Sequence, residues 1–178
     1  MTHAVLLSRA RHCRRVAPAM SFDQWLLAFH LLSAFAFVGA AVLFTILIVA
    51  VRKMDTPGPT VALAPVGLLG NVVVGIGSLG TIVFGVWLAI SEDRWQVWDG
   101  WVIAAIVLWA IGSGIGARAG KEYEHGLHRA RELQASGQTG PDEELLALNR
   151  TSRGLLFHTI SSIAMILILI DMIWKPGA

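Results

Sequence analysis

Three ionisable side chains lie inside long apolar stretches of this 178-residue sequence: His30, His158 and Asp171. An ionisable group within a membrane helix costs free energy, so each of these residues is a candidate functional site. Imidazole nitrogens also ligate haem iron, which adds a specific chemistry for the two histidines. What these three side chains can do therefore depends on the helices that hold them.

Four continuous apolar stretches must position these residues, at 25–51, 66–90, 101–117 and 155–174. Each approaches or exceeds the roughly 20 apolar residues that a helix needs to cross a bilayer. Only helices or closed barrels satisfy their backbone groups in lipid, and continuous apolar runs do not match the alternating pattern of a barrel. The sequence predicts an all-α fold, with residues 21–178 forming one membrane domain in which four transmembrane helices make an antiparallel bundle.

The composition excludes several classes of soluble protein. Hydrophobic residues make up 55% of the chain and charged residues 15%, whereas roughly a quarter of residues are charged in a typical soluble domain. The net charge is only +2 at pH 7, and the basic residues flank the apolar stretches. A nucleic-acid-binding protein would present a basic face on a soluble fold, so no nucleic-acid partner is predicted.

Two long polar segments lie outside the apolar stretches. Residues 1–20 form a basic extension that lacks the apolar core of a signal peptide, and we predict that this extension is disordered or not translated. Residues 118–153 predict a helical hairpin between the third and fourth spans. Its first helix continues out of the third span and ends near Gly137, and its second helix begins with Pro141 at its first position.

The distribution of lysine and arginine predicts the orientation in the membrane. The side that carries the hairpin holds Arg52, Lys53, Arg118, Lys121, Arg129, Arg131, Arg150 and Arg153. The opposite side holds Arg94 and Lys175, together with four arginines of the extension. Basic loops remain in the cytoplasm, so we expect a multi-pass protein of a bacterial cytoplasmic membrane with the hairpin inside and both termini outside.

A buried polar cluster is predicted near the cytoplasmic ends of three spans. Asn71 in the second span, Ser113 in the third and His158 in the fourth lie among small residues that let membrane helices approach closely. At such contacts polar side chains hydrogen-bond across the helices. We predict a cluster of Asn71, Ser113 and His158, with a hydrogen bond between His158 and Asn71 that fixes the helix packing.

His30 lies near the other end of the bundle. Antiparallel threading places His30 roughly 9 Å below the outer surface and His158 roughly 25 Å below it. The offset of about 15 Å is too large for two imidazoles on one iron. No cofactor is expected in the leading interpretation, and the alternative is a redox protein that binds b-type haem through His30 or His158 with a different second ligand.

The remaining ionisable groups have simpler interpretations. Lys175 follows Asp171 by four residues, which predicts an interfacial ion pair on one helix face with no chemistry. On the hairpin, carboxylates and imidazoles recur on one helix face among repulsive basic neighbours, which predicts a solvated face and no metal site. These hairpin residues are Glu122, His125, His128 and Glu132.

Two stretches carry a family resemblance: WLLAFHLLSAFAFVGAAVLF, residues 25–44, and FHTISSIAMILILIDMIWKPG, residues 157–177. They resemble the bacterial predicted integral membrane proteins numbered 2269 among domains of unknown function, a group that implies no activity. The first stretch is also similar to copper-resistance-D-type membrane domains and haem-dependent protoporphyrinogen oxidases, which share a histidine followed nine residues on by glycine, here His30 and Gly39. Those families have tryptophan-x-glycine-glycine where this sequence has Phe-Val-Gly-Ala at 37–40.

These observations favour a non-enzymatic membrane protein. No nucleophile with a neighbouring base is visible in the sequence. The expected roles are a packing partner, with a second copy or another membrane protein beside it in the bilayer, or a handler of a small solute. Neither the residues nor the resemblance names that solute.

Overall fold

The computed structural model describes residues 21–91 and 96–176, and these residues are helical with short connections. The helices are α1 (Phe22–Val51), α2 (Pro57–Ala62), α3 (Ala64–Ser91), α4 (Gly100–Ala135), α5 (Glu143–Asn149) and α6 (Ser152–Trp174). Four helical segments are long and apolar enough to cross a membrane, and each contains one of the predicted spans. This confirms the all-α fold with four candidate spans. The predicted extension, residues 1–20, lies outside the described residues.

Helix α1 begins with Ser21 as its N-terminal cap. The Ser21 side chain accepts a hydrogen bond from the backbone N–H of Gln24, and the Gln24 side chain accepts one from the backbone N–H of Ser21 at 2.9 Å. This reciprocal capping box satisfies two backbone donors at the start of the helix. Of the 30 residues of α1 only Leu26, Ala40 and Ile48 are buried, and the exposed apolar side chains of this helix form a surface that lipid would cover.

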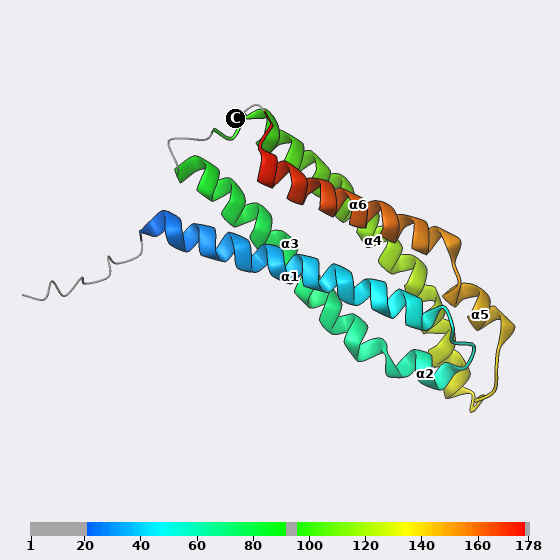
Figure 1. The fold of residues 1–178 in the computed structure, drawn as a ribbon. Coiled ribbons are helices and arrows are strands. Elements are labelled where there is room, and N and C mark those ends of the chain that lie inside the picture. Colours follow the sequence, from blue (N-terminus) through cyan, green and yellow to red (C-terminus); the bar gives the residue numbers. More distant parts are fainter. Residues whose placement is uncertain (1–20, 92–95, 177–178) are drawn as a thin grey trace, which may run out of the picture.

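Helices α1 and α3 pack closely through glycines of α3. A Cβ atom at Gly77 would lie 2.6 Å from the backbone nitrogen of Phe37, and one at Gly70 would lie 3.0 Å from the ring of Phe44. Residue numbers rise along one helix as they fall along the other, so the two helices run in opposite directions (Figure 1). Small residues allow such close approach between membrane helices, and here they bring two backbones together.

Helices α4 and α6 form a second close pair. The Ser161 hydroxyl donates a 2.8 Å hydrogen bond to the carbonyl of Gly112. One turn along α4, a Cβ atom at Gly116 would lie 2.9 Å from the same hydroxyl, and nearer the hairpin Gly154 lies against the ring of Tyr123. The pair is therefore held by a glycine-lined contact with a hydrogen bond across it.

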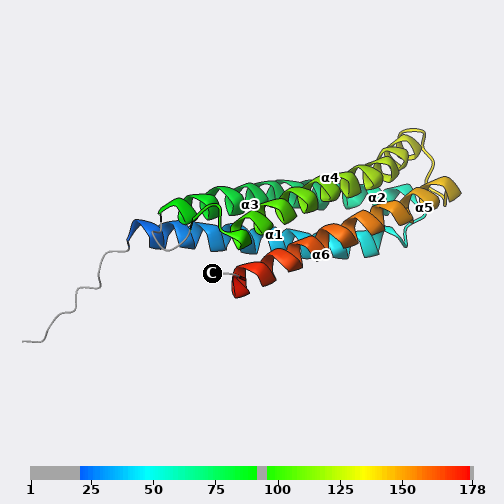
Figure 2. The same cartoon turned by 90° about the horizontal axis from the view of Figure 1, so that it is seen from above.

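The two helix pairs, here called layers, make few contacts with each other along the spans. They are drawn apart in Figure 1, whereas α3 and α4 overlap when the molecule is seen from above (Figure 2). Two hydrogen bonds join them among the described residues. The indole N–H of Trp109 donates to the Ser78 hydroxyl at 2.8 Å. At another point, Nε2 of His158 lies 2.9 Å from Oγ1 of Thr45.

A polar head, comprising residues 52–62 and 118–151, closes one end of the molecule where α2 and α5 lie (Figure 1). Its buried cluster consists of Ala130, Leu133 and Leu145, and Val61 packs against it. Asn149 is only 1% exposed, and its amide donates to the carbonyl of Met54 at 3.0 Å. The head is thus a packed unit that ties the α1–α2 connection to α4 and α5.

One connection is helical, and one predicted helix start needs correction. The connection after α1 contains helix α2, because Pro57 sits at the first helical position where its missing N–H costs nothing. The second hairpin helix begins at Glu143 instead of Pro141. Its cap is Asp142, whose carboxylate accepts a 2.7 Å hydrogen bond from the backbone N–H of Leu145.

The Asp142 carboxylate should make the stability of α5 depend on acid. The backbone N–H of Leu145, and then the Arg129 guanidinium, hold the pKa of Asp142 below its ordinary value of 3.8. A lowered pKa contributes stability above pH 3.8 that is lost as the pH falls through the folded-state value. Amide exchange in residues 143–149 should therefore accelerate below about pH 4. Asp142→Asn retains a capping oxygen without the charge, and it should remove this pH dependence; unchanged acid sensitivity in that variant would contradict the assignment.

Candidate functional site

A half-open groove of about 1250 Å³ lies between the α1/α3 pair and the α4/α6 pair and reaches the polar head. Its apolar walls include Phe37, Phe44, Leu47, Ile48, Leu68 and Val74. Polar side chains interrupt these walls on three of the four long helices: Asn71 and Ser78 on α3, Ser113 on α4, and His158, Ser161 and Ser162 on α6. Pockets with apolar walls and a few convergent polar groups are the usual form of small-molecule sites.

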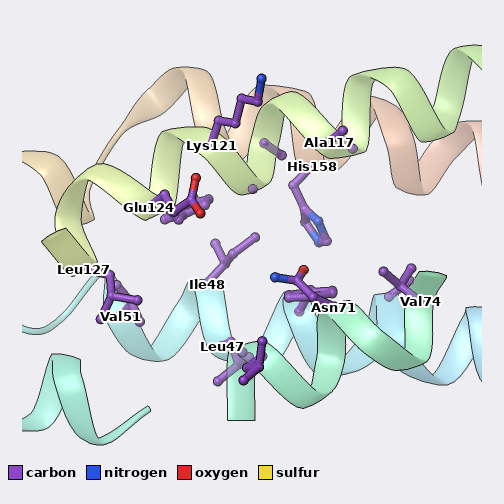
Figure 3. Close-up of a pocket in the computed structure, with 18 of the residues that line it drawn as sticks. Leu47, Ile48, Val51, Asn71, Val74, Ala117, Lys121, Glu124, Leu127 and His158 are labelled. Atoms are coloured by element: carbon purple, nitrogen blue, oxygen red, sulfur yellow. The ribbon is translucent and has the colours of Figure 1, made fainter. Parts of the chain in front are cut away.

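The three residues of the predicted polar cluster all line this groove. The His158 ring and the Asn71 amide project into the groove from opposite layers (Figure 3). Oγ of Ser113 is buried and has no hydrogen-bond partner among the described residues. A buried hydroxyl without a partner costs free energy, so a ligand group or water that reached Ser113 would be stabilising.

The expected hydrogen bond between His158 and Asn71 is not among those of the described residues, and His158 contacts Thr45 of α1 instead. The reason is the separation of the two layers, which leaves Asn71 exposed on the far wall of the groove. The Thr45 hydroxyl donates its single proton to the carbonyl of Ala41 at 2.9 Å. With the single proton of Thr45 assigned to Ala41, Thr45 accepts from His158 and the proton of the neutral imidazole lies on Nε2.

His30 occupies a different place. Its Nδ1 lies 3.0 Å from the carbonyl oxygen of Thr81, and its ring packs against Gly85 of α3. A carbonyl can only accept, so Nδ1 carries the proton. The 15 positions between His30 and Thr45 on α1 correspond to roughly 22 Å along the helix, so His30 and His158 belong to separate sites.

The two histidines differ in the surroundings that they would offer a haem. His158 already uses Nε2 in its contact with Thr45. His30 is not among the residues that line the groove or the smaller cavity of about 450 Å³ beside α5. A haem needs both a ligating nitrogen and a large apolar space beside it. His30 lines neither cavity, whereas His158 lines the groove and its Nδ1 makes no hydrogen bond among the described residues.

Asp171 and Lys175 have different neighbours. Oδ2 of Asp171 is buried and has no hydrogen-bond partner among the described residues, while Nζ of Lys175 lies 5.2 Å from the centroid of the Trp101 ring. The ion pairs between described side chains do not include the expected one between Asp171 and Lys175. Helix α6 ends at Trp174, and Lys175 adopts a left-handed φ of 42°, which takes its side chain off the helical i, i+4 alignment.

The charged face of the hairpin contributes to the lining of the groove, which the sequence did not predict. Lys121, Glu124, His125, His128 and Arg131 line the end of the groove at the polar head. His128 pairs with Glu132 at 3.4 Å on an exposed face. Within 21–91 and 96–176, no group of three or more His, Cys, Asp or Glu side chains is placed to hold a metal ion.

Three further residues of the site or its supports were not predicted: Thr45, Ser78 and Asn149. Thr45 carries a hydroxyl within an apolar span, and that hydroxyl was the available signal for a contact with another helix. Asn149 belongs to a local Asn-Arg-Thr sequence in a polar segment, and no sequence signal marked it as buried.

A scan of protein-family models and searches of curated proteins and of solved structures gave no match to this chain.

Proposed function

We propose that this chain is a non-enzymatic membrane protein that binds a small amphipathic molecule in the groove, as a handler of that solute. The observation that carries the proposal is the groove itself, whose apolar walls carry the convergent polar side chains of Asn71, Ser113 and His158. Polar groups in lipid are costly unless they find partners. A ligand with a polar end and an apolar chain would offer partners to the polar side chains of the groove and cover its apolar walls.

The proposal includes an arrangement in the membrane. The four long helices form an antiparallel bundle in a bacterial cytoplasmic membrane, with the polar head in the cytoplasm and both termini outside. The count of basic residues supports this orientation, because eight of the lysines and arginines near the spans belong to the side of the head. The resemblance to the group numbered 2269 among domains of unknown function is part of the same proposal.

Cysteine labelling tests the orientation. A cysteine at Gly137 should react in intact cells only with membrane-permeant maleimides, because it lies at the tip of the polar head. A cysteine at Val97 should react with impermeant reagents as well. The native Cys13 is replaced by serine in both variants so that each carries one thiol. Reversed labelling of the two positions would overturn the orientation.

Photolabelling tests the binding site. The probe is a dodecyl chain that carries an aryl diazirine, added to the purified protein in nanodiscs. Saturable labelling should map to residues of α3, α4 and α6 that line the groove, such as Leu68, Val74 and Met165. Labelling confined to lipid-facing residues such as Leu79 and Ile163, increasing linearly with probe concentration, would contradict a binding site in the groove.

A further inference from the structure

We infer that the groove selects a neutral headgroup bearing a hydroxyl, such as a phenol or an alcohol on an apolar chain. This inference rests on the proposed function and names the class of ligand. It follows from the hydrogen bonds around His158: Nε2 donates to Thr45 of α1, which leaves Nδ1 as an acceptor for the ligand.

The first step concerns the tautomer of His158. We assign the single hydroxyl proton of Thr45 to the carbonyl of Ala41 at 2.9 Å, so that its oxygen accepts from Nε2 of His158 at 2.9 Å. In the neutral ring the other nitrogen, Nδ1, is then an acceptor with a lone pair. No hydrogen bond between described residues uses Nδ1. A ligand that meets this nitrogen must supply a proton donor, and a hydroxyl does so.

The second step concerns the other two groups of the cluster. The Asn71 amide and the Ser113 hydroxyl line the same groove, and each can donate as well as accept. A hydroxyl oxygen that donates to Nδ1 of His158 keeps lone pairs that can accept from Asn71 or Ser113. A hydroxyl on the ligand can therefore donate to the site and accept from it, whereas an ether oxygen can only accept.

The third step concerns charge. Among the residues that line the groove, the basic ones are Lys121 and Arg131, together with three histidines. Lys121 lies eight residues beyond Ser113 on α4, roughly 12 Å along the helix, and its amine points away from His158 and Asn71 (Figure 3). An anionic headgroup at the cluster would be desolvated without a cation beside it, which is unfavourable. The site therefore favours a neutral headgroup.

Three probes with the same chain test the inference: para-dodecylphenol, its methyl ether para-dodecylanisole, and para-dodecylbenzoate. Their dissociation constants are measured on the full chain in nanodiscs by equilibrium dialysis. The phenol should bind about 3- to 18-fold more tightly than the ether, the range expected for one hydrogen bond in a membrane. The benzoate should bind more weakly than the phenol.

Two variants test whether the preference for the phenol over the ether depends on the ring nitrogens of His158. His158→Phe removes the acceptor and should bring the phenol-to-ether ratio close to one. Thr45→Val keeps the shape of the side chain but no longer fixes the tautomer, so the ratio should fall to an intermediate value. NMR of nitrogen-labelled histidine reports the tautomer directly and should show the proton on Nε2 in the wild type, whether or not a probe is bound.

The outcomes separate this inference from the proposed function. Saturable binding of all three probes with equal affinity would leave the groove as an amphiphile site and overturn the hydroxyl selectivity. Tighter binding of the benzoate, or an Nδ1–H tautomer in the wild type, would also overturn it. Absence of saturable binding for every probe would overturn the proposed function itself.

Discussion

Gly77→Leu should lower the free energy of unfolding by about 3 kcal/mol, because the added side chain would overlap backbone atoms of α1. A Cβ atom at this position would already lie 2.6 Å from the nitrogen of Phe37 and 3.0 Å from the carbonyl of Ser33. Backbone atoms within a helix cannot move aside as the end of a flexible side chain can. The two helices must therefore separate, and the close α1–α3 contact is lost.

Gly39→Leu is the matched control on the facing helix, because no atom lies within 4 Å of a Cβ atom placed there. The measurement is the unfolding midpoint in detergent, followed by circular dichroism as a denaturing detergent is added. Gly39→Leu should retain the wild-type midpoint. Equal stability of the two variants would show that α1 and α3 do not pack as described.

Asn149→Ala should lower the free energy of unfolding by about 2 kcal/mol, because it removes a buried hydrogen-bonding side chain from the polar head. The amide of Asn149 donates to the carbonyl of Met54 at 3.0 Å and lies 3.4 Å from the hydroxyl of Thr60, and the side chain is almost fully buried. Alanine leaves the carbonyl of Met54 without this partner and opens a cavity beside Gly126. Both effects destabilise the connection between α1 and α2.

The control for this prediction is Asn71→Ala, which removes the same side chain from an exposed position on the groove. Its midpoint should change little, since no hydrogen bond of Asn71 occurs among the described residues. Amide exchange should accelerate in α2 and α5 of Asn149→Ala and remain at the wild-type rate in Asn71→Ala. The reverse order of stability would contradict the account of the head.

The sequence was sufficient for the features that depend on one helix at a time. Length and continuous hydrophobicity determined the four candidate spans. The small-residue faces also brought Asn71, Ser113 and His158 to one groove, because the spacing of polar residues along each helix fixes the face on which they lie.

The partner of each polar group could not be obtained from periodicity. His158 contacts Thr45 on α1 because the two helix pairs form separate layers, and no single-helix pattern reports that separation. Lys175 lies over Trp101 because the chain turns into a left-handed conformation one residue after α6. Such contacts are set by tertiary packing and by a backbone conformation that hydrophobicity does not encode.

Filling the groove tests the central claim most directly. Gly75 lines the groove, and no atom lies within 4 Å of a Cβ atom placed there, so Gly75→Leu should preserve the fold and occupy the ligand space. Val72→Leu alters the exposed face of the same helix and serves as the control. The measurement is the concentration of the dodecyl aryl diazirine that gives half-maximal labelling in nanodiscs. We expect an increase of at least about tenfold for Gly75→Leu and the wild-type value for Val72→Leu, whereas equal values for all three proteins would contradict binding in the groove.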